Sequence, residues 1–157
     1  MAPRCQTRGV TSRWADSPRA SITRYGALVG EDSLVESLIA LLEGGELTAE
    51  LGEALAGPAS RSVLAGGSGG PSGYWVRVWA LRGLLYVFSE RATRYVLAAT
   101  ADPAWRVREM ALKVIAAHYL DDGLEAAARC QGDDVARVRA AAARALVRLV
   151  SAGTGRR

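Results

Sequence analysis

The sequence is poor in the residues that carry most catalytic and metal chemistry. Its 157 residues include one histidine, His118, and two cysteines, Cys5 and Cys130. A zinc site needs three or four such ligands at suitable spacing, and an activated nucleophile needs a base beside it. We therefore predict no metal site, no cofactor and no catalytic residue. We interpret His118 as a structural side chain on the core face of its helix.

Long apolar runs are also missing. The longest runs, Leu84–Phe88 among them, have five residues, whereas a membrane-spanning helix needs about 20. No apolar signal-peptide segment follows the N-terminal arginines. The two cysteines are far apart in the sequence, and the first lies in a tail, so no disulfide is expected between them. The protein is therefore expected in a reducing compartment. These absences predict a cytoplasmic protein with no membrane partner.

Lysine is nearly absent, with one residue against 19 arginines, and the net charge is +4. Residues 1–30 hold five arginines and one aspartate, whereas residues 31–157 hold 15 basic and 15 acidic residues. A nucleic-acid-binding domain shows a basic surplus, so nucleic acid is an unlikely partner. Residues 1–30 lack an apolar period and are predicted to be a disordered basic tail. A basic interaction arm, a targeting segment and a start-site artefact remain alternatives.

Aromatic and β-branched residues do not alternate, and the helix formers Ala and Leu dominate, which predicts an all-α fold. In residues 31–57 a capping pattern, Ser33-x-x-Glu36, precedes leucines at helical spacing. These residues are predicted to form a helical hairpin, with helices at 33–43 and 47–56. Residues 58–73 are rich in glycine and predicted to be a linker. They hold no lysine, so a phosphate-binding P-loop is not expected.

Residues 74–151 contain a repeat with a period of about 31 residues, in the range typical of helical repeat proteins. The segment GYWVRVWALRGL begins at Gly73, DPAWRVREMALKVI begins at Asp102, and DDVARVRAAAARAL begins at Asp133. Each copy predicts a long helix, and short helices are expected between them at about 90–100 and 124–130. A helix pair of this length cannot bury its apolar stripe alone, so the copies must stack. Four columns align in the three copies: Val76, Val107, Val138; Arg77, Arg108, Arg139; Ala80, Ala111, Ala142; and Leu84, Ile115, Leu146.

The copies resemble the short HEAT-like repeats first named from phycobilisome lyases, which carry the pattern D-P-x-x-x-V-R-x-x-A. The middle copy matches this pattern in full and the last copy matches it without the proline, whereas the first copy has Pro71 at the aspartate position. The resemblance implies an α-α superhelix, a HEAT-like α-solenoid, over about residues 74–150. It also implies that aspartates and arginines of successive repeats form a ladder with a structural role. The ladder residues are Asp102, Arg108, Asp133 and Arg139.

The resemblance further implies that the long helices line the inner, concave surface of the solenoid, where such folds bind partners. We therefore predict a non-catalytic scaffold that binds another protein. The alternative functions are a nucleic-acid-binding or DNA-repair protein and, more remotely, a bilin lyase. The alternative for the surface is that its long basic side chains serve only for solvation. The candidate partner-binding residues lie on the helix face opposite the core columns and are Tyr74, Arg82, Trp105, Glu109, Lys113 and Arg144.

Two helices raise further expectations. The helix at 74–88 is apolar almost all round, so we expect the N-terminal hairpin to fold over it. The last helix has an alanine-rich outer side, which is either a cap or a self-association face. The sequence identifies neither the partner nor the oligomeric state.

Overall fold

The computed structural model describes residues 17–67 and 73–154, and over these ranges the chain is all-helical, with no strand. Two 3-10 turns, Glu90–Ala92 and Asp121–Gly123, precede α6 and α8. The helices are α1 Pro18–Val29, α2 Glu31–Leu42, α3 Ala49–Ala56, α4 Ala59–Leu64, α5 Tyr74–Tyr86, α6 Thr93–Ala99, α7 Trp105–His118, α8 Leu124–Cys130 and α9 Ala136–Thr154. No helix in these ranges is long and apolar enough to cross a membrane.

Helix α1 corrects the prediction of a disordered tail over residues 1–30. The hydroxyl of Ser17 accepts a hydrogen bond from the Ala20 amide, and Pro18 occupies the first helical turn, where proline is well tolerated. Ile22 is fully buried, and the Ser21 hydroxyl donates to the Ala54 carbonyl over 2.8 Å. The buried Ile22 and the hydrogen bond of Ser21 thus help to hold a segment without an apolar period against the other helices. Residues 1–16 of the predicted tail lie outside the described residues.

The predicted linker is also helical in part, because residues 59–64 form α4. Val63 and Ser60 of α4 are buried, and the Ser60 hydroxyl donates to the Gly57 carbonyl over 2.8 Å. Local contacts with α3 therefore order a segment that composition alone marks as flexible. Residues 68–72 of the predicted linker, Pro71 among them, lie outside the described residues.

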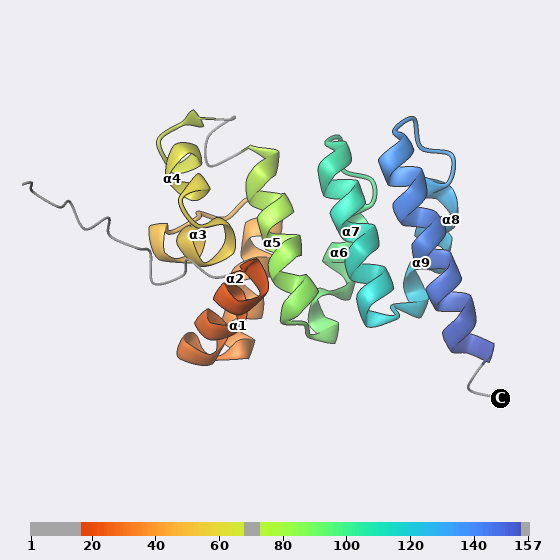
Figure 1. Cartoon of the computed structure of the whole chain (residues 1–157), viewed down its shortest axis with the longest axis horizontal. Helices are drawn as coiled ribbons and strands as arrows, with labels where there is room; N and C mark the ends of the chain where they lie inside the picture. The colour runs from red at the N-terminus through yellow and green to blue at the C-terminus, as the bar shows by residue number, and fades with distance from the viewer. Residues whose placement is uncertain (1–16, 68–72, 155–157) are drawn as a thin grey trace, which may run out of the picture.

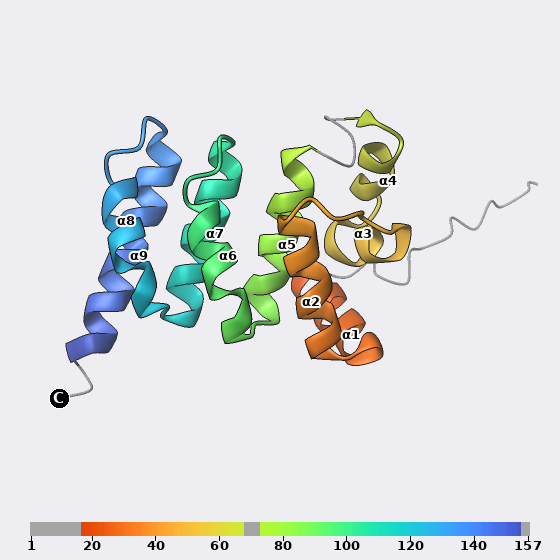
Figure 2. The same cartoon turned by 180° about the vertical axis from the view of Figure 1, so that it is seen from behind.

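The long helices α5, α7 and α9 follow one another in a row, and α6 and α8 lie behind them (Figures 1 and 2). Helices α1–α4 gather at the α5 end of the row, and α9 lies at the opposite end. The valine and alanine columns of the repeat are buried in all three long helices, with exposures of 0–2%. The repeat periodicity thus marks the faces that form the core.

Helix α5 lies between α2 and α7, so it is covered on two sides, in agreement with its nearly continuous apolar circumference. The approach of α2 is close: a Cβ added at Gly83 would lie 2.6 Å from a methyl carbon of Leu38. Leu38 is fully buried. Any larger residue at position 83 would therefore displace the Leu38 side chain in the core.

Two ion pairs join successive copies of the repeat with the same spacing. The Arg77 Nε lies 2.7 Å from the Asp102 Oδ2, and the Arg108 Nε lies 2.7 Å from the Asp133 Oδ2. A second bond from Nη2 makes each pair bidentate, the strongest geometry for arginine and carboxylate. Each arginine reaches forward to the next aspartate. The first pair therefore needs no acid at position 71.

Both aspartates also order the turn before the next helix. Oδ1 of Asp102 accepts from the Ala104 amide over 2.8 Å, and Oδ1 of Asp133 accepts from the Val135 amide over 2.9 Å. The sequence favours Asp102 as the cap and Pro103 as the first helical residue, whereas helix α7 begins two residues later, at Trp105. The aspartate stands outside the helix because its carboxylate bridges the turn and the preceding arginine.

Candidate binding surface

A cluster of aromatic and arginine side chains lies at the N-terminal ends of the long helices. The guanidinium carbon of Arg106 lies 4.3 Å from the ring centroid of Trp105, 5.4 Å from that of Trp75 and 6.0 Å from that of Tyr74. Such distances allow a cation–π attraction, worth about 0.5–1 kcal/mol at exposed sites. All four side chains are half-buried. The repeat period explains the assembly, because Tyr74 and Trp105 are each the first residue of their helix.

The cluster continues toward α9 and toward α4. The guanidinium carbon of Arg137, on α9, lies 5.5 Å from the ring centroid of Trp105. Toward α4, the ring centroid of Trp75 lies 6.3 Å from that of Trp79, and the two ring planes are inclined by 29°. We call Tyr74, Trp75, Trp105, Arg106 and Arg137 the Trp–Arg surface; Trp79 itself is buried, with an exposure of 4%.

A cavity of about 380 Å³ opens beside the Trp–Arg surface, between α5 and the α3–α4 segment. Trp75, Trp79 and Arg82 line it from α5, and Ala56 and Val63 line it from the α3–α4 segment. The Arg82 Nη1 donates to the Leu55 carbonyl over 3.4 Å, which holds the guanidinium near the cavity. The cavity could hold one aliphatic or aromatic side chain.

The prediction that Glu109 faces outward is wrong. Glu109 is only 7% exposed, and its Oε1 lies 3.1 Å from the Lys113 Nζ and 3.2 Å from the Arg137 Nη2. Burial by itself raises the pKa of Glu109, but the hydrogen bonds and charges of Lys113 and Arg137 outweigh it and hold the pKa below its ordinary value. Helix α9 covers the position, so Glu109 joins two helices instead of contacting a partner.

The predicted basic row is only partly formed. Lys113 is committed to Glu109, and Arg82 is half-buried at the cavity edge. Arg144 is exposed on α9, and within the described ranges no hydrogen bond or ion pair engages it. The structure thus brings Tyr74 and Trp105 together through Arg106, whereas the three cations of the predicted row differ in exposure and bonding.

The sequence interpretation missed Trp75, Trp79, Arg106 and Arg137. Trp75, Arg106 and Arg137 occupy corresponding positions in the three copies, one residue after the column that contains Tyr74 and Trp105. An outward helix face spans more than one column. Scoring that neighbouring column for aromatic and arginine residues would have found them.

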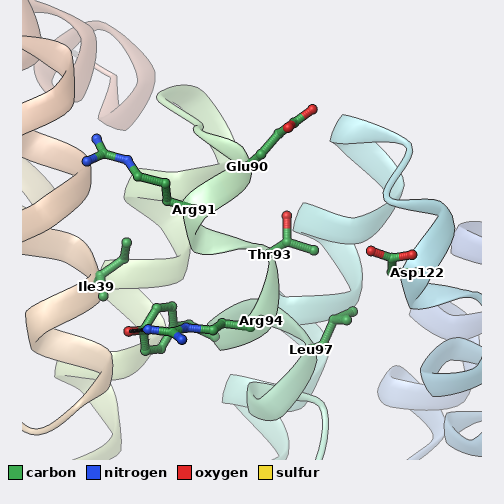
Figure 3. Close-up of a pocket in the computed structure, with 8 residues that line it drawn as sticks. Ile39, Glu90, Arg91, Thr93, Arg94, Leu97 and Asp122 are labelled. Carbon is green, nitrogen blue, oxygen red and sulfur yellow. Dashed lines mark hydrogen bonds between the residues drawn. The ribbon is translucent and has the colours of Figure 1, made fainter.

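A second hollow, of about 600 Å³, lies on the α6 side and is lined by residues of both charges (Figure 3). Arg91 extends from it toward α2, where it pairs with Asp32 at 2.9 Å and Glu36 at 3.1 Å. Arg94 lies over the ring of Tyr95, 4.6 Å from its centroid. The arginines of this hollow are thus already engaged, and its polar groups do not converge on one point.

His118 lies in a structural setting. Its ring stacks on Phe88, with centroids 4.3 Å apart, and Nε2 lies 2.9 Å from the Leu84 carbonyl. In the part of the chain that the structure describes, no three His, Cys, Asp or Glu side chains come together as metal ligands do. The histidine therefore ties α7 to the end of α5.

Comparisons with protein-family models, with curated proteins and with solved structures found no match to this chain.

Proposed function

We propose that this protein is a non-catalytic binding module, built as a short HEAT-like α-solenoid, that holds a segment of another protein on its Trp–Arg surface. Two features support the solenoid. The long helices lie side by side in chain order, and the Arg77–Asp102 and Arg108–Asp133 pairs repeat with the same 25-residue separation. Such a fold offers a continuous surface for an extended partner.

Arg106 carries the functional part of the proposal. Its guanidinium lies over three aromatic rings, and no carboxylate among the described residues pairs with it. A guanidinium that stacks by its face keeps its N–H edge available for a carboxylate. Tryptophan, tyrosine and arginine are also the residues that most often dominate interface energetics.

The charges around the surface define the partner. Glu109 pairs with Lys113 and Arg137, whereas Arg82 and Arg106 have no carboxylate partner among the described residues, so these five side chains carry a surplus of three positive charges. The adjoining cavity is walled by two tryptophans. The matching segment is acidic and carries one aliphatic or aromatic side chain that enters the cavity.

The experiment is a selection of displayed peptides against the full chain, followed by affinity measurements on the selected sequences. We expect acidic peptides with one large apolar residue, and at least about tenfold weaker binding after Trp105→Ala or Arg106→Ala. The matched control is Arg94→Ala, which removes the arginine of a similar arginine–aromatic pair on α6 and should leave the affinity unchanged. Peptides without acidic residues, or affinities insensitive to Arg106, would contradict the proposal.

Single-stranded nucleic acid is the second candidate, because bases also stack on exposed tryptophan and arginine side chains. The observation in its favour is the same group of rings, Trp75, Trp105 and Tyr74, with cations beside them. Titration of a labelled oligonucleotide distinguishes the two. Binding that falls steeply with salt and depends on Trp105 would favour nucleic acid.

A further inference from the structure

The last arginine of the repeat series lacks the partner that the other two have. Arg139 donates from Nη1 to the carbonyls of Asp133 and Asp134, over 2.7 and 3.0 Å. Arg108 makes the corresponding bonds to the carbonyls of Asp102 and Pro103, over 2.8 and 3.1 Å. The Nε and Nη2 edge of Arg108 then binds the next aspartate. Within the described residues, the same edge of Arg139 has no carboxylate.

The face of α9 next to Arg139 is also unpaired. On α7, Leu112 and Ala116 share the helix face on which Glu109 meets α9, and both are buried. Their counterparts one repeat later, Ala143 and Val147, are exposed, and Val147 is 67% accessible. Inside the protein this face receives another helix. On α9 the described residues leave it open.

The two ends of the row carry opposite charge. Helix α9 has four arginines and no acid, whereas residues 31–57 have seven acids and no basic residue. These segments lie at opposite ends of the row (Figure 1). Across the described ranges, residues 17–67 have three basic and seven acidic side chains, and residues 73–154 have twelve basic and eight acidic ones. The net charges are −4 and +4.

The acidic end also holds carboxylates that the fold does not use. Glu43 and Glu46, in the connection between α2 and α3, are exposed and have no ion-pair partner among the described residues. Leu28 of α1, at the same end, is 62% accessible. This end therefore offers both free carboxylates and an apolar side chain, as the α9 end offers a free arginine edge and Val147.

We propose that the open face of α9 binds the acidic N-terminal end of a second copy of this chain, so that copies join head to tail. The Nε and Nη2 edge of Arg139 receives a carboxylate of the second copy, as Arg77 and Arg108 receive Asp102 and Asp133 within one chain. A contact between two different faces leaves one of each free after every addition. Association therefore continues beyond a dimer.

The test measures mass against concentration for the full chain, by sedimentation or light scattering, at about 50 mM and about 500 mM salt. We expect species larger than dimers at low salt and smaller ones at high salt, because salt screens exposed charges. Arg139→Glu blocks one face, and Glu43→Gln with Glu46→Gln removes the carboxylates of the other. Each variant alone should associate at least about 30-fold more weakly.

A mixture of the two variants gives the sharpest result. Each variant keeps the face that the other lacks, so an equimolar mixture should form one-to-one dimers and nothing larger. Association of the Glu43/Glu46 variant by itself would indicate an α9–α9 contact and overturn the proposal. The proposal would also be overturned if the wild type, or the mixture of the two variants, stayed monomeric. The open face of α9 would then bind a partner other than a second copy of this chain.

Three controls separate this contact from folding and from the Trp–Arg surface. Val147→Glu should reproduce the loss caused by Arg139→Glu without touching the backbone bonds of Arg139. Arg94→Glu makes the same charge change on α6, away from both ends of the row, and should leave association intact. Trp105→Ala should also leave it intact, although it removes peptide binding. Circular dichroism confirms that each variant is folded.

Discussion

The Arg108–Asp133 pair should contribute more to the stability of the fold than any surface ion pair in the described residues. Its side chains are 17% and 10% exposed, and its two bonds measure 2.7 and 2.9 Å. Charge-assisted hydrogen bonds contribute about 1.5–3 kcal/mol, and breaking a fully buried pair costs about 3–5 kcal/mol. This pair is partly buried, so a coupling free energy of about 2 kcal/mol is expected.

Two substitutions at Asp133 separate its two roles. Asp133→Asn removes the charge but keeps an oxygen for the Val135 amide, whereas Asp133→Ala removes both. The difference between them is the turn-capping contribution, about 1 kcal/mol. The expected losses are therefore about 2 kcal/mol for asparagine and about 3 kcal/mol for alanine.

The assay is urea unfolding, followed by circular dichroism and by tryptophan fluorescence, for a double-mutant cycle of Arg108→Gln and Asp133→Asn. Coincident transitions establish that the unfolding is two-state. The reference cycle uses Glu125 and Arg129, an exposed pair at helical spacing with side-chain exposures of 87% and 64%. That pair should couple by only about 0.3–0.5 kcal/mol. A coupling for Arg108 and Asp133 no larger than the reference value would refute the reasoning.

Three further predictions follow from single residues. The Arg108 hydrogen bond holds the pKa of Asp133 below its ordinary value. The contribution of this ion pair to folding stability is therefore fully present above the pKa of Asp133 in the unfolded chain, about 4, and is lost as pH falls through its pKa in the folded protein. The excess stability of the wild type over Asp133→Asn should therefore shrink below about pH 4 in urea titrations. Gly83→Ala should lower the melting temperature, because overpacking against buried Leu38 costs about 1–3 kcal/mol and outweighs a helix-propensity gain of at most about 1 kcal/mol. Gly153→Ala, where nothing lies within 4 Å of the added carbon, should cause no such loss. In a Cys5→Ser variant, Cys130 should react at least about tenfold more slowly with a thiol reagent in buffer than in urea, because its burial raises the thiol pKa and limits access; equal rates would contradict the burial.

The alignment of the repeat copies identifies only some residues of the candidate surface. Tyr74 and Trp105 are identified from the sequence because the repeat period gives them the same helix position. Arg106 is missed because its importance depends on which rings from two helices surround it. Glu109 is misplaced because its exposure depends on the position of α9, the long helix of the following repeat.

The sequence by itself determined the helical class, the buried valine and alanine columns and the long helices of the repeat. These features follow from local periodicity and from the same residue types at the same helix positions in each copy. Only the tertiary structure decided that residues 18–29 and 59–64 are helical, since α1 is ordered by contacts with α2, α3 and α5, and α4 by contacts with the adjacent α3. It also decided the direction of the arginine–aspartate pairs, in which each arginine bonds the aspartate of the following copy. That direction leaves Arg139 without a carboxylate among the described residues, and no sequence pattern marks it as different from Arg77 and Arg108.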